Sequence, residues 1–350
     1  MAHKIVALPG DGVGPEVTAC AHAVLDRAAR AFGFQYEYEE ALIGGDAVDH
    51  AQDPLPADVE ALCAASDGVL LGAVGGPKWD MAPPALRPER GLLRLRSVLG
   101  VFANLRPVRI APIDIPTSPF RPGHLAGVDV LFVRELTGGI YFGEKTEGDQ
   151  AASDLCTYER REVERVARVA GRLAGDRRRR VTHVDKQNVL ATSRLWRRTT
   201  EQIFRDEFPD VDLRHMLVDA MAMALITKPA EFDVVLTENM FGDILTDEAA
   251  ALAGSIGLLP SASIGDDGPG LFEPIHGSAP DIAGRGAANP VGMIRCVAML
   301  LGSSLGESEA AAAIERAVDD ALKAGVATHD LGGSAGSEEM TRAIVERIDP

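Results

Sequence analysis

Residues 181–254 decide the fold class. Three short apolar runs rich in β-branched residues, VTHVD (181–185), DLRHMLVD (212–219) and FDVVLTE (232–238), are each followed by a longer segment with helical spacing. Strands that alternate with helices are typical of an α/β protein with a largely parallel sheet. The helical segments are expected at 193–208, 220–229 and 240–254.

The rest of the chain continues this pattern. KIVALPG (4–10) predicts a strand, GDGVGPE (10–16) a glycine-rich turn, and residues 17–33 a helix that ends at a glycine. The runs DGVLLGAVG (67–75) and DVLFVRE (129–135) predict further strands. The glycines of the turn do not have the GxGxxG spacing of a Rossmann dinucleotide fingerprint, so the turn favours a different α/β fold.

Composition excludes several classes of protein. The chain has 350 residues, 46% of them hydrophobic and 25% charged, and 52 acidic against 35 basic residues give a net charge of −17. A surface for nucleic acid or anionic lipid needs concentrated basic charge. The densest basic run, residues 177–180, is expected at the solvated end of a helix. We therefore expect no nucleic-acid partner and no membrane association.

The location and redox chemistry follow from similar observations. No apolar run approaches the roughly 20 residues of a membrane span, and the first residues lack the apolar core of a signal peptide. The four cysteines form no CxxC pair, and the eight histidines show no spacing typical of metal ligands. We expect a cytoplasmic protein without a disulfide framework or zinc site.

An acidic pair, Asp243 and Asp247, lies in TENMFGDILTDEAA (237–250). Residues four apart share one face of a helix, so the pair can be the solvated side of an amphipathic helix. The apolar stripe of that helix would comprise Leu245, Ala249, Leu252 and Ile256. Like charges at this spacing repel, and no lysine or arginine is near in sequence. A divalent cation such as Mg²⁺ or Mn²⁺ would remove the repulsion.

Two more ionisable residues are expected near this pair. In the segment 181–254, Lys186 directly follows the first expected strand, Asp219 ends the second strand, and Asp243 starts the helix after the third strand. Ligands of parallel α/β sheets bind outside the carboxyl ends of the strands. The three side chains therefore fall where a site is expected.

Basic and glycine-rich segments supply further candidates. Arg96, Arg106 and Arg134 can clamp carboxylates or phosphates through their planar guanidinium groups, or form surface ion pairs. Tyr141 can be catalytic or a packed aromatic residue. The loop EPIHGSAPDIAGRGAANP (273–290) offers backbone N–H groups for an adenosine moiety, or is only a series of turns.

Together these segments resemble the β-decarboxylating hydroxyacid dehydrogenases, whose members act on 3-isopropylmalate, isocitrate, homoisocitrate, tartrate or D-malate. The resemblance covers essentially the whole chain, and seven motifs occur in the family's order. They are LPGDGVGPEV, FANLRP, VRELTGGIYFGE, VDKQNVL, VDAMAM, ENMFGDILTDEA and HGSAPDIAG…ANP.

The resemblance implies a non-Rossmann α/β fold of two domains around a cleft. Residues 1–101 plus 254–350 would form the cofactor-side domain, and residues 102–253 the domain for substrate, metal and dimerisation. It also implies a homodimer in which Lys186 and Asp219 reach the partner's site.

The stretch PERGLLRLR (88–96) is similar to the branch that acts on 3-isopropylmalate in leucine synthesis. Two leucines suit an isopropyl group, whereas a third carboxylate would need a cation or a hydroxyl there. The resemblance implies NAD-dependent oxidative decarboxylation, with Asp281 selecting NAD over NADP. Related hydroxyacids, a non-enzymatic metal-binding role and a DxxxD phosphohydrolase are the alternatives.

The resemblance assigns the site residues as follows. Catalysis would use Lys186, Tyr141 and Asp219; substrate binding Arg96, Arg106, Arg134, Glu89, Leu92 and Leu93; NAD binding Val13, His276, Gly277, Ser278, Ala279, Asp281 and Asn289; and Mg²⁺ or Mn²⁺ binding Asp219, Asp243 and Asp247.

Overall fold

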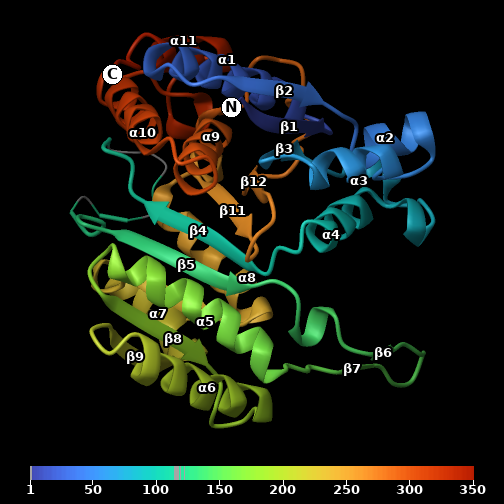
Figure 1. Cartoon of the computed structure of the whole chain (residues 1–350), viewed down its shortest axis with the longest axis vertical. Helices are drawn as coiled ribbons and strands as arrows, with labels where there is room; N and C mark the ends of the chain where they lie inside the picture. The colour runs from blue at the N-terminus through green and yellow to red at the C-terminus, as the bar shows by residue number, and fades with distance from the viewer. Residues whose placement is uncertain (1, 114–117, 119, 122) are drawn as a thin grey trace. The chain divides into compact units, whose positions relative to one another are not determined.

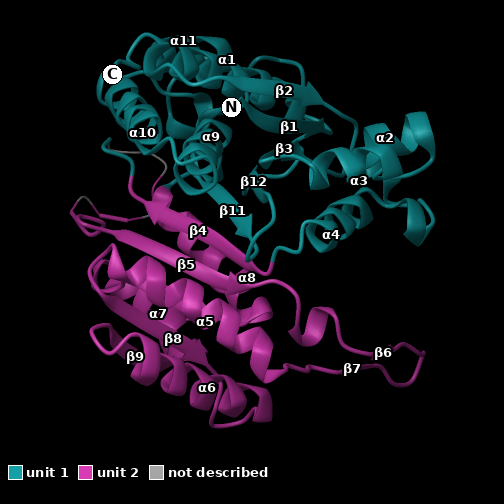
Figure 2. Ribbon diagram, in the orientation of Figure 1, with its two compact units in different colours: residues 1–101, 111–117, 254–350 teal, residues 102–110, 118–253 magenta. Residues whose placement is uncertain are grey.

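The computed structural model describes residues 2–113, 118, 120–121 and 123–350. The chain forms two compact units (Figure 2). Unit 1 comprises residues 1–101, 111–117 and 254–350, and unit 2 comprises residues 102–110 and 118–253. Strands and helices alternate in both units, which confirms the predicted α/β class.

The strands of unit 1 lie in the order β2, β1, β3, β12, β11 (Figure 1). β1 pairs in parallel with β2 and β3, β3 pairs in parallel with β12, and β12 is antiparallel to β11. The strands are β1 His3–Gly10, β2 Tyr36–Glu40, β3 Gly68–Ala73, β11 Pro260–Ile264 and β12 Gly270–Pro274. The helices are α1 Gly14–Phe32, α2 Gly44–Ala51, α3 Ala57–Ala64, α4 Pro88–Val98, α9 Val291–Ser303, α10 Ser308–Lys323 and α11 Ser337–Val345.

Alternation along β3 distributes the helices of unit 1 over two faces. Val69 and Leu71 belong to a core cluster with residues of α3 and α4. Gly72 points the other way, and a β-carbon there would lie 2.8 Å from Cα of Gly14 in α1. Successive strand residues face opposite sides of a sheet, so helices cover both faces of β3.

The opening strand, turn and helix form as predicted. β1 leads into a turn, and α1 has a proline in its first turn, where its missing N–H leaves no hydrogen bond unmade. Gly33 ends the helix with φ of 77°, a left-handed conformation that glycine adopts without steric cost. No helix in the described part of the chain is both long and apolar enough to cross a bilayer.

The strands of the unit 2 sheet lie in the order β4, β5, β10, β8, β9, and all of them except β10 are labelled in Figure 1. β4 is antiparallel to β5, and the other neighbours are parallel. Its strands are β4 Ala103–Arg109, β5 Asp129–Glu135, β8 Arg180–Asp185, β9 Asp212–Leu217 and β10 Val234–Thr237. A separate antiparallel pair is formed by β6 Lys145–Thr146 and β7 Ser153–Asp154. The helices are α5 Arg160–Gly175, α6 Ala191–Glu207, α7 Val218–Thr227 and α8 Asn239–Ala250.

Two pairs of helices pack against the sheet of unit 2. One core cluster joins Phe132, Val184 and Val235 of the sheet to Met221 of α7 and Leu245 of α8. α5 packs against β5 and β10, and α6 against β8 and α5. This packing fixes the carboxyl ends of β5, β8 and β10, where the predicted site residues begin.

Three predicted boundaries are corrected. The helix expected to reach residue 254 ends at Ala250, and Ile256 is exposed instead of continuing the apolar stripe. The second strand ends at Leu217, so Asp219 lies in the first turn of α7. α8 begins at Asn239, which places Asp243 one turn inside the helix.

The basic run at 177–180 is also not a solvated helix end. α5 stops at Gly175, and the run connects it to β8. Nε of Arg177 donates to Asp233 at 2.8 Å, and a terminal nitrogen donates to Asp129 at 2.8 Å. These carboxylates are distant in sequence, so the sequence alone did not indicate the ion pairs.

The core of unit 1 can be tested at Leu71, which is 1% exposed. Leu71→Ala should lower the free energy of unfolding by about 2–5 kcal/mol, because the cavity is only partly refilled. Equilibrium urea unfolding followed by circular dichroism measures this. Met81→Ala is the control, since Met81 is 94% exposed and its loss should cost less than about 0.5 kcal/mol. Equal effects would contradict the core assignment.

Candidate active site

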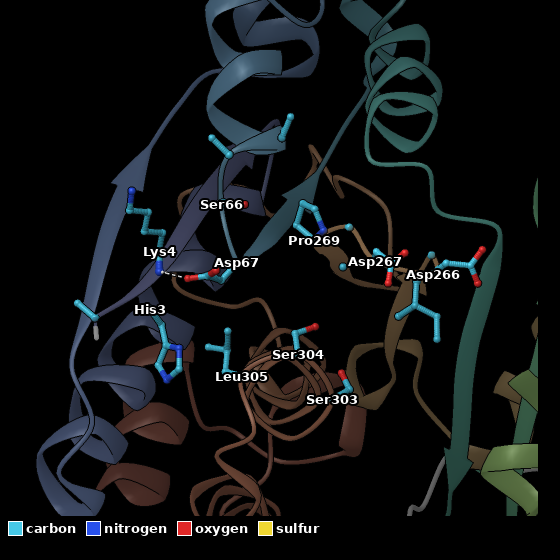
Figure 3. A pocket seen from close by; sticks show the side chains of 17 residues that line it. His3, Lys4, Ser66, Asp67, Asp266, Asp267, Pro269, Ser303, Ser304 and Leu305 are labelled. Atoms are coloured by element: carbon cyan, nitrogen blue, oxygen red, sulfur yellow. Dashed lines mark hydrogen bonds between the residues drawn. The ribbon is translucent and has the colours of Figure 1, made fainter.

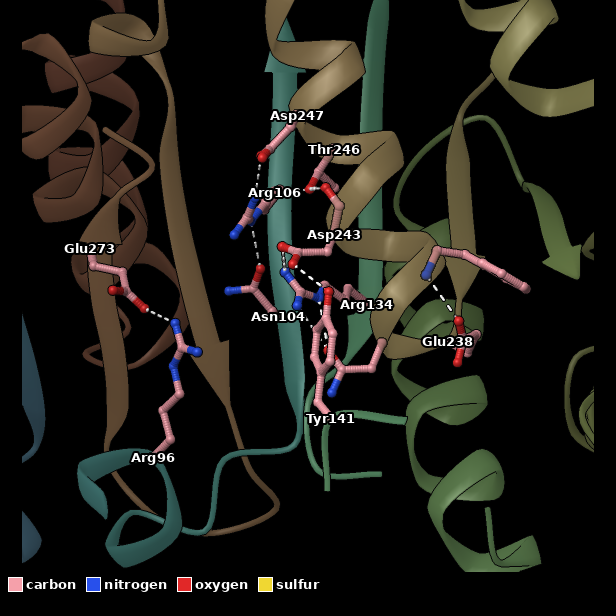
Figure 4. A network of polar contacts seen from close by, with 12 residues as sticks. Arg96, Asn104, Arg106, Arg134, Tyr141, Glu238, Asp243, Thr246, Asp247 and Glu273 are labelled. Atoms are coloured by element: carbon pink, nitrogen blue, oxygen red, sulfur yellow. Dashed lines mark hydrogen bonds and ion pairs between the residues drawn. The ribbon is translucent and has the colours of Figure 1, made fainter. Parts of the chain in front are cut away.

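The centre of the polar network in unit 2 is Arg134, at the end of β5 (Figure 4). Its Nε and one terminal nitrogen donate to Oδ1 of Asn239 at 3.1 and 2.8 Å. Its other terminal nitrogen forms an ion pair with Asp243. The side chain of Arg134 is only 8% exposed, so these contacts are needed to offset the cost of burying a cation.

The start of α8 is shaped to receive this arginine. The Glu238 side chain caps the helix by accepting from N–H of Phe241 at 2.9 Å. Asn239 and Asp243 lie one turn apart on the side that faces Arg134. Between them, Gly242 leaves space, because a β-carbon there would lie 2.6 Å from Cγ of Arg134. A larger residue at 242 would displace the guanidinium.

Arg106 of β4 makes a similar contact one turn further along α8 (Figure 4). One terminal nitrogen donates to Oγ1 of Thr246 at 2.8 Å and to Oδ1 of Asp247 at 3.2 Å. Its Nε donates to Oδ1 of Asn104 at 2.9 Å. Two antiparallel strands thus each present one arginine to the same face of α8.

These contacts correct one expectation from the sequence. Two cations relieve the repulsion between Asp243 and Asp247, because Arg134 pairs with Asp243 and Arg106 pairs with Asp247. The pair is therefore neither a plain solvated face nor a bare pair of anions. It is half of a balanced cluster of two carboxylates and two guanidinium groups.

Tyr141 joins the same cluster. Its hydroxyl donates to Oδ2 of Asp243 at 2.9 Å, although the residue is 44% exposed. Burial of the ring, and then the hydrogen bond to Asp243, raise the pKa of Tyr141 above its ordinary value. The phenol therefore stays protonated at neutral pH and can act as a proton donor.

Lys186 and Asp219 form a separate pair in unit 2. The ammonium group of Lys186, directly after β8, contacts Oδ1 of Asp219 in the first turn of α7. This hydrogen bond lowers the pKa of Asp219. Side-chain exposures of 29% and 62% leave both groups accessible.

The predicted metal site takes Asp219 from a second copy of the chain, so one chain alone is not expected to bring all three carboxylates together. Among the residues that the structure describes, Asp219, Asp243 and Asp247 do not form a cluster of three ligand atoms; His183, Asp185 and His215 are the group that does. The predicted residues of unit 2 instead form two groups, one around Asp243 and one around Lys186.

In unit 1, α4 carries four of the predicted substrate residues. Glu89, Leu92, Leu93 and Arg96 follow helical spacing along one side of the helix. Leu93 is 43% exposed, an accessible position for a leucine. Arg96 donates to Oε1 of Glu273 at 2.7 Å (Figure 4). Sequence analysis missed Glu273, because an acid in a short strand carries no distinguishing signal.

The glycine-rich loop after β12 is tied to the first turn of the chain. N–H of Val13 donates to the carbonyl of Ser278 at 2.8 Å, and a β-carbon at Gly12 would lie 1.9 Å from that carbonyl. Only glycine permits so close an approach. Carboxylate oxygens of Glu16, in α1, accept from N–H of Gly286 and Ala288 at 3.3 and 3.1 Å. The two predicted cofactor segments therefore lie side by side.

The remaining predicted cofactor residues differ in their surroundings. His276 has an Nε2 atom without a hydrogen-bond partner among the described residues, and burial lowers the pKa of its imidazole. Ala279 has φ of 38°, a conformation unusual for alanine. Asn289 is held by Asp330 at 2.9 Å and accepts from N–H of Val291. Gly277 and Asp281 are exposed.

Asp11 is a buried carboxylate that the sequence analysis did not single out. It accepts from the backbone N–H groups of Gly45, Asp46 and Gly75 at 2.9, 2.9 and 2.7 Å. Burial raises the pKa of Asp11, although these hydrogen bonds act in the opposite direction. Its place in the GDG turn was the available signal. Asp11 joins that turn to the first turn of α2 and to the loop after β3.

A cavity of about 1020 Å³ in unit 1 is not part of this site (Figure 3). It lies where β1, β3 and β12 begin, and His3, Asp67 and Gly270 are among the residues that line it. No predicted site residue is among them. Ligands of parallel α/β sheets bind at the opposite, carboxyl ends of the strands.

Comparison with known proteins gives a consistent result. A sequence profile described as isocitrate/isopropylmalate dehydrogenase matches residues 4–348. A protein of Anaeromyxobacter dehalogenans named 3-isopropylmalate dehydrogenase is 56% identical, covering 99% of this chain and 100% of its own length. The protein of the same name from Geobacillus kaustophilus is 52% identical, with coverages of 99% and 94%.

Solved structures give the same fold. The isocitrate dehydrogenase of Methylococcus capsulatus matches with a TM-score of 0.87 and 35% identity, covering 99% of this chain and 100% of its own. A β-decarboxylating dehydrogenase from Thermococcus kodakarensis, in its apo form, has a TM-score of 0.84 and 36% identity, with coverages of 99% and 96%. The predicted fold class is confirmed.

The hold on Arg134 can be tested at Asn239. Asn239→Ala removes an acceptor of two hydrogen bonds from a buried guanidinium, which should cost about 1–3 kcal/mol of unfolding free energy. Equilibrium denaturation measures the loss. Asn188→Ala in the same unit is the control, because Asn188 is exposed. If both variants were as stable as the parent, Asn239 would not be needed to bury Arg134.

Proposed function

The chain belongs to the isocitrate/isopropylmalate dehydrogenase family, and we propose that it oxidises and decarboxylates (2R,3S)-3-isopropylmalate with NAD. The products are 4-methyl-2-oxopentanoate and CO₂, and the step belongs to leucine biosynthesis. The observation that carries the choice of substrate is the side of α4 that presents Glu89, Leu92 and Leu93 together with Arg96. Relatives named for this substrate are 56% and 52% identical over nearly the whole chain, which supports the same choice.

The proposed substrate has two carboxylates and a branched apolar arm. Arg96, Arg106 and Arg134 hold the carboxylates, and the leucines of α4 cover the isopropyl group. Each arginine already pairs with a carboxylate, from Glu273, Asp247 and Asp243 respectively. A guanidinium arranged for one carboxylate is arranged for another, because the planar fork fits the same group.

Asp243 and Asp247, with Asp219 of the partner subunit, would hold Mg²⁺ or Mn²⁺. The donor set fits, since hard divalent ions take carboxylate oxygens, and the Asp243 and Asp247 side chains are 37% and 74% exposed. When bound, the ion supplies Lewis acidity at the C2 oxygen of the substrate. Binding of the ion by the aspartates would release Arg134 and Arg106 for the substrate carboxylates.

The predicted NAD residues fit a nucleotide through backbone groups more than through side chains. The loop from His276 to Ala279 approaches the first turn of the chain at Val13, and Asp281 is exposed for hydrogen bonds to a ribose. Val13, His276, Gly277, Ser278, Ala279, Asp281 and Asn289 are the proposed contacts. NAD supplies the acceptor for the hydride from C2.

Two side chains move protons in this proposal. Lys186 accepts the proton of the C2 hydroxyl as the hydride leaves C2, either directly or through water. An ammonium ion has no lone pair, so Lys186 acts as the base only after it has left its contact with Asp219 and given one proton to solvent. After CO₂ is lost, Tyr141 donates a proton to C3, and its raised pKa keeps that proton in place at neutral pH.

We propose that two copies of the chain complete each site. Lys186 and Asp219 pair with each other and not with Asp243 of their own chain. Both side chains are partly exposed, so a second copy of the chain can contact them. Large apolar side chains on α7 and α8, the helices that carry Asp219 and Asp243, support this arrangement. Met223 and Ile226 of α7 and Ile244 of α8 are 69%, 40% and 59% exposed, as expected for residues that a partner covers.

Kinetics with purified protein test the substrate. NADH formation from 3-isopropylmalate should require Mg²⁺ or Mn²⁺ and stop with a chelator. Leu92→Ala should lower kcat/KM for 3-isopropylmalate by about 10- to 100-fold, because one lost apolar contact is worth about 1–3 kcal/mol. The same variant should leave kcat/KM for D-malate, which lacks the branched arm, nearly unchanged.

Val98→Ala is the matched control, since Val98 lies on another side of α4 and is 39% exposed. It should keep kcat/KM for 3-isopropylmalate near the parent value. A parent enzyme that preferred D-malate, tartrate, isocitrate or homoisocitrate would overturn the substrate assignment, while leaving the dehydrogenase class intact.

Subunit complementation tests the shared site. Lys186→Met and Asp243→Asn should each be inactive alone. Unfolded together and refolded, they should regain about a quarter of parental activity, because half of a random mixture is heterodimer and one of its two sites is intact. Refolded single variants and refolded parent protein are the controls. If the mixture stayed inactive while the refolded parent recovered, Lys186 and Asp243 would act within one chain.

A further inference from the structure

Two histidines of unit 2 face each other across neighbouring strands. His183 of β8 lies opposite His215 of the parallel strand β9. Their Nδ1 atoms are 3.0 Å apart. His183 is fully buried, and its ring is stacked on Trp196 with an interplanar angle of 5°. The proposed dehydrogenase reaction uses neither histidine.

The contact leaves a lone pair of one Nδ1 atom directed at the other Nδ1 atom. Two Nδ1 atoms at hydrogen-bond distance share one proton, so at least one of them carries a free electron pair. Nε2 of His215 lies 3.3 Å from a carboxylate oxygen of Glu201. An ionised carboxylate accepts hydrogen bonds but has no proton to donate. His215 therefore keeps its proton on Nε2 and presents the lone pair of Nδ1 to His183.

A carboxylate completes the group. Oδ2 of Asp185 is 3.7 Å from Nδ1 of His183, and the three ligand atoms lie within 4.8 Å of one another. Bonds of about 2.0–2.1 Å to a tetrahedral zinc ion place neighbouring ligand atoms about 3.3 Å apart. The spacings of 3.0 and 3.7 Å lie on either side of that value. We propose that His183, His215 and Asp185 form a binding site for a Zn²⁺-like transition-metal ion.

The residues around this group suit a metal site. The contact of His215 with Glu201 is the carboxylate–histidine arrangement that orients metal-bound imidazoles. Asp185 is held by Arg197 at 2.8 and 3.1 Å. Two carboxylates and one guanidinium leave a net negative charge, which favours a dication. With metal bound, His183 stays neutral by carrying its proton on Nε2.

One of the three ligands, His215, borders a surface cavity. β9 is the last strand of the unit 2 sheet, and His215 lines a surface cavity of about 380 Å³ together with Glu201, Phe204 and Leu213. A fourth ligand position on the cavity side of His215 is open to water. Three protein ligands with one open position are typical of zinc sites that keep a bound water, in contrast to closed structural sites.

The ligand set distinguishes this site from the proposed Mg²⁺ or Mn²⁺ site. Imidazole nitrogens select borderline metals such as Zn²⁺, Co²⁺, Ni²⁺ and Cu²⁺, whereas Mg²⁺ prefers oxygen. The inference stands apart from the dehydrogenase proposal, because none of its ligands is assigned to substrate, NAD or Mg²⁺. Asp185 directly precedes Lys186 in the sequence, so an ion here would bind next to the proposed base.

Calorimetry and spectroscopy test the site on the full-length protein. Zn²⁺ titrated in excess Mg²⁺ should bind once per chain. Co²⁺ should give the intense visible absorption of a tetrahedral complex, and Zn²⁺ should displace it. Both signals should disappear in His215→Gln. Glu201→Gln should weaken Zn²⁺ binding by about 10- to 100-fold, since it removes only the orienting carboxylate.

Two controls separate this site from other metal binding. Asp243→Asn removes a proposed Mg²⁺ ligand and should leave Zn²⁺ affinity unchanged. His50→Ala removes an exposed histidine that also lies beside an aspartate, Asp46, at 3.1 Å, and it should likewise bind Zn²⁺ normally. His215 lies on an edge strand, so His215→Gln should keep the parental circular dichroism spectrum.

The proposal is overturned if the parent binds no stoichiometric Zn²⁺, or if His215→Gln and His183→Gln bind it as tightly as the parent. Loss of binding in His50→Ala alone would assign the ion to the surface pair instead. Zn²⁺ should also raise the melting temperature of the parent but not of His215→Gln. An equal rise in both would also contradict the proposal.

Discussion

The buried guanidinium of Arg134 is the constraint on which the rest of the site depends. A cation placed in the interior without partners is strongly unfavourable, so β5 and α8 have to meet in one arrangement. Asn239 accepts two hydrogen bonds from it, and Asp243 supplies the opposite charge. Gly242 provides the space for the side chain. These residues surround Arg134 where it lies, one residue before the end of β5.

Other parts of the site are arranged around the same contact. Asp243 also accepts the hydroxyl of Tyr141, so the aspartate connects a buried cation to a proton donor at the surface. One turn along α8, Arg106 and Asp247 repeat the arrangement with more exposure. The cluster is electrically balanced without any ligand. In the proposed reaction, a divalent ion and an anionic substrate would enter by exchanging partners, with the aspartates turning to the ion and the arginines to the substrate.

The helices and strands were predictable wherever a local pattern fixed them. The period of the apolar residues identified the strands and helices of residues 181–254, and the glycine at 33 ended α1 as expected. Helix ends that depend on tertiary packing were not predictable. α8 stops at Ala250 because a tighter turn follows it, and Asp219 lies in a helix instead of at a strand end. The basic run at 177 became a set of internal ion pairs because Asp129 and Asp233 lie beside it in the fold.

The sequence by itself determined the α/β class, the family motifs and the chemical types of the site residues. It determined these because helix and strand periods are local and the motifs are contiguous. Only the tertiary structure decided which charges neutralise one another. Arg134 and Asp243 are 109 positions apart, and Lys186 and Asp219 are 33 apart. The histidines had no metal-type spacing, yet pairing of β8 with β9 places His183 against His215. Electrostatic and hydrogen-bonding partners depend on distance in space, and that distance is set only when the strands pair and the helices pack.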